Sequence, residues 1–102
     1  MSQAKKTNQH ANAKPLFALG QVVATPGALD LLDETGTDGF VLMHRHQNGD
    51  WGVVPPEDAE SNEDALVTGC RILSSYLLGT EKLWIITEAD RSVTTLLLPS
   101  EY

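Results

Sequence analysis

The sequence lacks the features of a membrane protein, of a secreted protein and of a site built from cysteines. Its single cysteine, Cys70, excludes an internal disulfide and a zinc site made of several cysteines. No stretch approaches the roughly 20 apolar residues that a membrane-spanning helix needs, and the N-terminus has no apolar run of the kind found in a secretory signal. These absences predict a cytoplasmic protein.

Basic residues are scarce as well, which limits the possible partners. From Leu16 onward the chain has four of them against all fourteen of its carboxylates, so this part carries a formal net charge of −10. Proteins that bind nucleic acid need several Lys or Arg side chains to displace counterions from phosphates, and an anionic membrane surface repels an acidic protein. We therefore expect no direct binding to nucleic acid or to membranes. The four basic residues are Arg45, Arg71, Lys82 and Arg91.

The length and the apolar content predict one folded domain. The chain has 102 residues, of which 41% are hydrophobic, and this is enough for a single compact core. Residues 1–14 are polar and show no periodicity, so we expect a disordered tail there. Residues 15–102 then form the single domain.

The first part of this domain predicts a short strand followed by helices. Residues 21–25 are rich in Val and Thr, which favour strands. Thr25 before a proline is typical of a helix start and Gly36 of a helix end, which predicts a helix over 26–34. Residues 40–47 fit either a helix or a strand. We favour the helix, because capping residues bracket the run and four successive apolar residues suit a wide buried face.

The second part predicts two more helical pieces and then three strands. Residues 56–60 are expected to form one helical turn, and residues 63–69 a short helix capped by Ser61 or Asn62. Three runs separated by turns follow, which is typical of an antiparallel meander. The runs cover residues 71–78, 82–88 and 92–99. The predicted fold class is α+β, with the N-terminal strand able to join the meander as a fourth strand.

Apolar residues are expected on both faces of this meander. With helices covering one face, the other is left for a second copy or another protein, so we predict a homodimer or a bound protein partner there. The residues behind this prediction are Trp84, Ile86, Leu97, Ile72 and Tyr76. The predicted core consists of Val22, Leu29, Leu32, Phe40, Met43, Leu66, Ile72, Leu73, Ile85, Ile86, Leu96 and Leu98.

Three motifs together carry a family resemblance. They are LFALGQVVATPGAL, HRHQNGDWG and LWIITEADRSVTTLLLPSEY, spread over residues 16–102. With them the chain resembles a family of small bacterial proteins encoded on plasmids and integrative elements, often labelled plasmid-related proteins or type I restriction endonuclease subunit M. The chain has no glycine-rich cofactor loop and no Asn-Pro-Pro motif, and it is too short for a methyltransferase domain. The resemblance therefore implies a genomic setting, mobile DNA near transfer or defence genes, and carries over no catalytic residues.

Two histidines near the middle of the chain could start a metal site. His44 and His46 would share a face on a strand but diverge by about 200° on a helix. Asp50 and Glu88 are the acids that could complete the ligand set. The simpler interpretation is a pair of surface or half-buried imidazoles near the negative end of a helix. A small metal-assisted hydrolase or nuclease is the alternative.

Asp50 and Trp51 lie between two glycines that permit tight backbone geometry. Trp51 can fill the protein's own core or anchor a partner, and Asp50 can brace the loop. We predict that a protein partner binds through Trp51, Asp50 and the acidic run that follows them. The acidic run that follows is either a solvated helix start or a surface that binds a basic partner, with imitation of nucleic acid as a further alternative. Its carboxylates are Glu57, Asp58, Glu60, Glu63 and Asp64.

Arg71 and Arg91 could form a clamp for an anion. Alternatively, Arg91 pairs with Glu88 or Asp90 in a turn. No phosphate loop, dinucleotide fingerprint, zincin motif or nucleophile with a His-and-acid pair is present, and no cofactor is expected. We therefore predict a non-enzymatic protein-interaction factor, encoded on mobile DNA, that acts on a host defence, restriction or transfer system through a protein partner.

Overall fold

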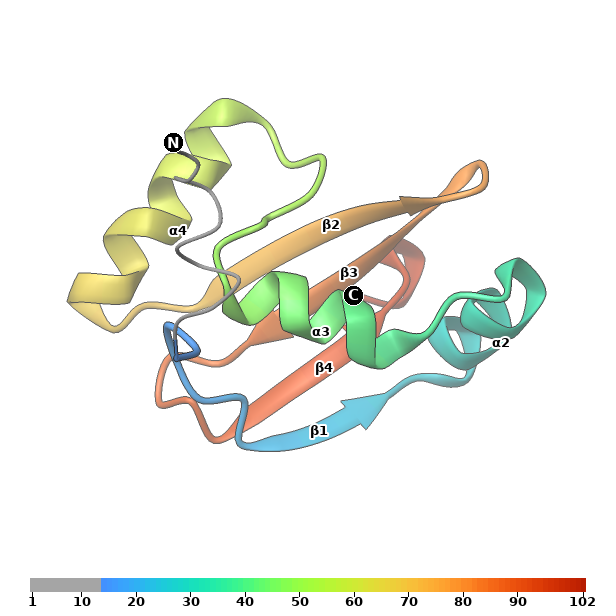
Figure 1. Ribbon diagram of the computed structural model, residues 1–102, viewed down its shortest axis with the longest axis horizontal. Coiled ribbons are helices and arrows are strands. Elements are labelled where there is room, and N and C mark those ends of the chain that lie inside the picture. Colours follow the sequence, from blue (N-terminus) through green and yellow to red (C-terminus); the bar gives the residue numbers. More distant parts are fainter. Residues whose placement is uncertain (1–13) are drawn as a thin grey trace.

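The computed structural model describes residues 14–102, which form a four-stranded sheet with three α-helices (Figure 1). The predicted α+β class is confirmed. The predicted tail over 1–14 lies outside the described residues, apart from Lys14. The elements are β1 (Gln21–Ala24), α2 (Pro26–Thr35), α3 (Gly39–Gln47), α4 (Pro56–Thr68), β2 (Ile72–Leu78), β3 (Glu81–Thr87), β4 (Val93–Leu97) and the 3₁₀ turn η1 (Pro99–Glu101). No helix in this part of the chain is long and apolar enough to span a bilayer.

Capping residues set the ends of α2 and α3, as the sequence predicts. Thr25 Oγ1 accepts a hydrogen bond from a main-chain N–H of the first turn of α2 (3.1 Å), and Gly36 ends this helix in the left-handed region with φ 63°. Asp38 caps α3 by accepting from the N–H of Phe40 (2.9 Å). The helical interpretation of residues 40–47 is therefore confirmed.

Helix α4 corrects the prediction of two short helical pieces. It is continuous over Pro56–Thr68, with Ser61 and Asn62 inside it, and it ends at Gly69 as expected. The side chain of Asn62 does not cap a new helix, because it turns toward the sheet. Its Nδ2 donates to Leu73 O (2.7 Å), and its Oδ1 accepts from Leu73 N (3.1 Å). A tertiary contact with β2 thus replaces the local capping bond that the sequence favours.

The predicted antiparallel meander is confirmed, with a fourth strand beside it. Strands β2 and β3 pair antiparallel with Leu78 opposite Glu81, and β3 pairs antiparallel with β4. Strand β1 pairs with β4 in parallel, so the strand order is β1-β4-β3-β2 and the sheet is mixed rather than purely antiparallel. The long connection between β1 and β4, which holds the helices and the other strands, permits this parallel pairing.

The main core lies between the sheet and helices α2 and α3. Ile72 and Tyr76 of β2 and Ile85 of β3 face this side, because alternate residues of a strand point to the same face. The buried residues of this cluster are Ala28, Leu31, Leu42, Met43, Tyr76, Leu78, Leu83, Ile85 and Leu96. A smaller cluster, formed by Trp51, Ala65 and Ile72, joins α4 to the sheet.

The opposite face of the sheet is partly covered by the chain's own C-terminus. Trp84, Ile86 and Leu97 lie on this face, and Ile86 and Leu97 are buried. Tyr102 packs edge-on against Trp84, with ring centroids 5.8 Å apart, and accepts a hydrogen bond from Arg71 Nη2 (2.7 Å). Binding of a second copy or of another protein at this face stays a prediction.

Three residues of the predicted core lie at the surface instead. Val22 is 41% exposed, Leu29 56% and Phe40 78%. Val22 lies on the edge strand β1, and Leu29 and Phe40 lie on parts of α2 and α3 that the sheet does not cover. An apolar pattern predicts a helix, but the rotation of that helix against the sheet decides which apolar residues are buried. The other predicted core residues are buried or partly buried.

Candidate functional site

A chain of hydrogen bonds runs through the interior, with His46 of α3 at its centre. His46 Nδ1 lies 2.6 Å from Ser74 Oγ, and Nε2 lies 2.9 Å from Thr87 Oγ1. Thr87 Oγ1 lies 2.7 Å from Thr94 Oγ1, which donates to the main-chain oxygen of Leu19 (2.7 Å). All four side chains are buried. The network thus joins α3 to β2, β3, β4 and the segment before β1.

The last acceptor fixes the direction of the bonds that connect Leu19 to His46. A carbonyl oxygen can only accept, so Thr94 donates its one hydroxyl hydrogen to Leu19 and must accept from Thr87. Thr87 in turn accepts from Nε2–H of His46. If the ring is neutral, its hydrogen is therefore on Nε2 and Nδ1 accepts from Ser74. Both ring nitrogens are already bonded.

Burial keeps this imidazole uncharged. Desolvation, with a smaller contribution from the positive charge of Arg91, lowers the pKa of His46 to about 3. The rings of Phe17 and Trp51 pack against the imidazole, with centroids 5.1 and 6.1 Å away. At neutral pH the ring is a hydrogen-bonding part of the core, and this arrangement does not suit it to act as an acid, a base or a metal ligand.

The structure does not bring the predicted metal ligands together. His44 and Glu88 are exposed. Asp50 binds the guanidinium of Arg45 (Nε to Oδ2, 2.6 Å) and accepts from the N–H of Gly52 (3.2 Å). The hydrogen bond from Arg45 lowers the pKa of Asp50 below its usual value. The described part of the chain contains no group of three or more His, Cys, Asp or Glu side chains placed to hold a metal ion.

Trp51 fills the protein's own core, the first of the two interpretations that the sequence allows. Its side chain is 6% exposed, and its Nε1–H donates to Glu63 of α4 (3.0 Å). The loop approaches the sheet this closely because Gly52, with φ 76°, lies so near Ser75 that a Cβ would overlap the carbonyl oxygen. Trp51 therefore offers little surface to a partner.

Arg91 binds main-chain oxygens within the protein. Its Nη1 donates to Cys70 O (2.6 Å), and its Nη2 donates to Ala65 O (3.0 Å) in the last turn of α4, where a cation also favours the helix dipole. The guanidinium of Arg71 binds Tyr102 instead. The two arginines have separate partners, so the predicted anion clamp gains no support from their geometry.

All five carboxylates of α4 are exposed, and four of them share one surface, which we call the acidic face. It consists of Glu57, Glu60, Glu63 and Asp64. At about 100° per residue, these four side chains fall within about 120° of the helix circumference. Asp58 lies instead on the side of the helix that carries the buried Asn62 and Ala65, so it does not belong to this surface. Helix α2, which carries Asp30, Asp33 and Glu34, lies at the opposite end of the sheet from α4 (Figure 1).

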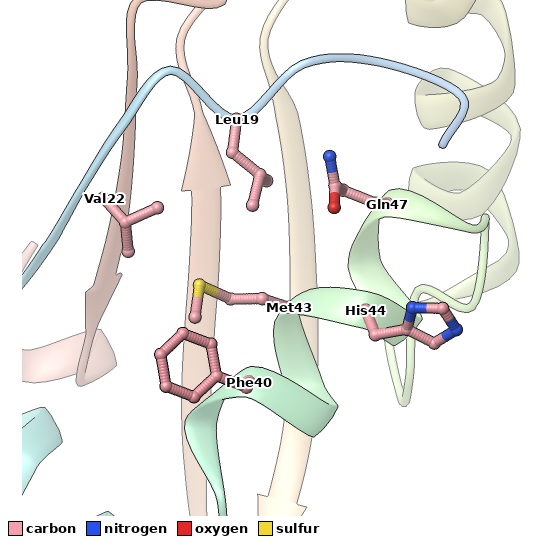
Figure 2. A pocket seen from close by; sticks show the side chains of 6 residues that line it. All are labelled: Leu19, Val22, Phe40, Met43, His44 and Gln47. Atoms are coloured by element: carbon pink, nitrogen blue, oxygen red, sulfur yellow. The ribbon is translucent and has the colours of Figure 1, made fainter. Parts of the chain in front are cut away.

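An apolar groove lies between β1 and α3, and we call it the β1–α3 groove (Figure 2). Its volume is about 490 Å³. Figure 2 shows Val22 of β1 and Met43 of α3 on its two sides, with the ring of Phe40 beside Met43. The groove is lined by Leu19, Val22, Phe40, Met43, His44 and Gln47. The exposed Val22 of β1 and the exposed Phe40 of α3 both line it.

The chain matches no protein-family model, no curated protein and no solved structure. Two features of the structure are not among those predicted from the sequence: the hydrogen-bond network around His46 and the β1–α3 groove. A signal for the first exists, because Ser74, Thr87 and Thr94 occupy positions that strand alternation places on the core face. Hydroxyls at such positions need buried partners. No local signal exists for the groove, because β1 and α3 form it together.

Proposed function

We propose that the protein is a non-enzymatic accessory factor of mobile DNA, which binds a basic surface of another protein through the acidic face of α4. The observation that carries this proposal is the composition of that helix, which exposes five carboxylates and has no basic residue. The genomic setting implied by the family resemblance makes a protein of a host defence, restriction or transfer system the expected partner. We expect the two to meet in the cytoplasm.

The acidic face is held in a fixed position, which supports this role. Asn62 ties the inner side of α4 to the main chain of Leu73. Glu63 accepts from the indole of Trp51, and Arg91 binds a carbonyl oxygen at the end of the helix. A charged surface that is already ordered loses less conformational entropy on binding, and its charge pattern selects the partner.

The alternatives receive less support from the positions of the residues. A metal-assisted hydrolase would use His46 and Asp50, which bond to Ser74, Thr87 and Arg45 within the protein. A nucleic-acid mimic would need a continuous row of carboxylates, whereas the two helices that carry several of them, α2 and α4, lie at opposite ends of the sheet (Figure 1). Binding to a protein needs only a local acidic patch, and the acidic face has that form.

A charge-swap experiment tests the proposal. One variant changes the acidic face by Glu57→Gln, Glu60→Lys and Asp64→Lys. The control makes the same change in net charge on α2, by Asp30→Lys, Asp33→Lys and Glu34→Gln. Tagged forms of the wild type and both variants are used to capture partners from the native host. The identified partner is then purified, and its binding is measured by calorimetry at low and high salt.

We expect the α4 variant to lose the partner and the α2 variant to retain it, with affinity falling as salt screens the charges. Equal capture by both variants would contradict the proposal. Affinity that does not change with salt would contradict it as well.

A further inference from the structure

The two edges of the sheet differ in how their outward backbone groups are bonded. At the β2 edge, Ser75 N donates to Trp51 O (3.0 Å), and Ser75 O accepts from Val53 N (2.7 Å). Two positions earlier, the N–H and C=O of Leu73 both bond to the side chain of Asn62. Residues of the chain itself thus bond these outward groups of β2. Such bonds protect a sheet edge against pairing with a strand of another molecule.

The β1 edge has no such protection within residues 14–102. Gln21 N donates to a carbonyl oxygen just before β4 (2.9 Å), and Thr25 N donates to Leu96 O (3.0 Å). Alternate residues of a strand direct their backbone groups to opposite sides, so Val22 and Ala24 direct theirs away from β4. Strand β1 is the end of the strand order, and Figure 1 shows it as the lower edge of the sheet.

We propose that this open edge binds the β1 strand of a second copy of the chain, antiparallel, to form a symmetric dimer with one continuous sheet. A two-fold axis through Val23 places Val22 opposite the partner's Ala24, and each such pair exchanges both N–H···O=C bonds. Val23 then faces the partner's Val23 across the axis. This dimer does not depend on the acidic face of α4.

The distribution of charge argues for a second copy as the occupant. From Leu16 onward the chain carries a formal net charge of −10, so two copies repel each other across most of their surfaces. Residues 15–29, which include β1, contain no charged residue. Two identical acidic molecules can therefore pair their β1 strands without placing a charged residue of one strand opposite a charged residue of the other.

The β1–α3 groove fits the same arrangement. A two-fold axis perpendicular to the sheet places helix α3 of both copies on one face, so the two grooves flank the joint between the β1 strands. Phe40 is 78% exposed and Val22 41%, and both lie at this groove (Figure 2). The second copy would cover both side chains, so two apolar residues that are exposed in one copy would be buried in the dimer interface. Because the paired segment is short, we expect a dimer that dissociates on dilution.

Charge pairs at position 23 test both the dimer and its register. Val23 is 39% exposed, so Val23→Glu and Val23→Lys leave the core unchanged but place like charges opposite each other on the two-fold axis. The matched controls are Val67→Glu and Val67→Lys on α4, where the side chain is 89% exposed. Sedimentation equilibrium over about 1–500 µM measures association, and native mass spectrometry identifies mixed dimers.

We expect each position 23 variant to associate at least about tenfold more weakly than the wild type. An equimolar mixture of Val23→Glu and Val23→Lys should recover association as a mixed dimer, and the Val67 variants should behave as the wild type. Circular dichroism checks folding, and Phe40→Ser gives a second test that leaves β1 unchanged. A wild type that is monomeric over the whole range overturns the proposal. So does a Val23→Glu variant that dimerises as well as the wild type, or an edge that binds an extended peptide of another protein but no second copy.

Discussion

The imidazole of His46 accepts from Ser74 and donates to Thr87, so protonation would place an N–H where the ring now accepts. Burial of the ring away from water also disfavours its protonated form and so lowers the pKa of His46. The sequence predicts two surface or half-buried imidazoles near a helix end, and this is correct for the exposed His44 but wrong for His46. Which of the two faces the sheet depends on the rotation of α3, which no local pattern specifies.

His46 should make folding sensitive to mild acid. In the unfolded chain an imidazole titrates near pH 6.5, whereas in the folded protein the pKa of His46 is about 3. Between these values the unfolded state binds more protons, so the stabilisation is complete above pH 6.5 and is lost as the pH falls toward 3. We expect a loss of up to about 1.4 kcal/mol in unfolding free energy per pH unit.

Urea unfolding between pH 4.5 and 7 measures this dependence. A His46→Gln variant provides the reference, because it removes the titrating group and keeps a side chain that can hydrogen-bond. The pH dependence of the wild type should exceed that of the variant. Parallel curves, or an NMR titration in which the His46 ring shifts near neutral pH, would show that the imidazole is not held neutral.

At the scale of single elements, Asn62 shows why α4 is longer than its sequence predicts. Asn is a strong capping residue, and a proline-led turn followed by Asn favours two separate pieces. In the folded protein the side-chain amide of Asn62 bonds to the main-chain N–H and C=O of Leu73, as a residue of a neighbouring strand would. The helix therefore continues through Asn62, and a local preference gives way to a contact between residues 11 positions apart.

Replacing Asn62 by Ala should loosen the β2 edge. The N–H and C=O of Leu73 would lose their partner, and we expect unfolding free energy to fall by about 1–3 kcal/mol. The matched control is Ser61→Ala, on the exposed neighbour, where the change should stay within about 0.5 kcal/mol. Hydrogen exchange of the Leu73 amide, read by NMR, separates this effect from a general loss of helix. Unchanged protection of that amide would rule out the role assigned to Asn62.

Two glycines of the chain allow the cost of a steric overlap to be measured separately from the cost of a positive φ. Gly52 and Gly69 both have positive φ, 76° and 80°, but a Cβ at Gly52 would overlap Ser75 O, whereas Gly69 has nothing within 4 Å. We expect Gly69→Ala to cost about 1–2 kcal/mol, the usual penalty for this backbone region. Gly52→Ala should cost clearly more, because the bridge between the Trp51 loop and β2 must also open. Thermal unfolding of both variants measures the difference, and equal losses would contradict the steric argument.

For the molecule as a whole, the sequence predicts the strands and helix ends that depend on local patterns. It does not predict the features that depend on how these elements pack together. Alternation and turn residues predict the three strands of the meander, and Thr25 and Gly36 predict the ends of α2. The parallel pairing of β1 with β4 joins residues about 70 positions apart, as in the Val22 and Thr94 pair, and no local signal encodes it. The same holds for the exposed side chain of Phe40, because the sheet does not cover that turn of α3.

The excess of carboxylates, and their clustering on α4, predict how the stability of the whole molecule depends on salt. Carboxylates three or four positions apart repel each other on α4, and the chain from Leu16 onward has few cations to compensate them. Screening this repulsion should stabilise the folded state. We expect the unfolding free energy to rise by about 0.5–1 kcal/mol between about 0.05 and 0.5 M NaCl at neutral pH.

The α4 variant with Glu57→Gln, Glu60→Lys and Asp64→Lys provides the comparison. Because it removes like-charge pairs and adds cations, its stability should be higher at low salt and should depend less on salt than that of the wild type. Urea unfolding at several NaCl concentrations measures both effects, and potassium chloride in place of sodium chloride checks for specific ion binding. A wild type whose stability falls with salt would mean that attractive pairs such as Arg45 and Asp50 outweigh the repulsion along α4. The same two proteins then show whether the acidic face destabilises the isolated fold, which we expect if this face binds a basic partner as proposed.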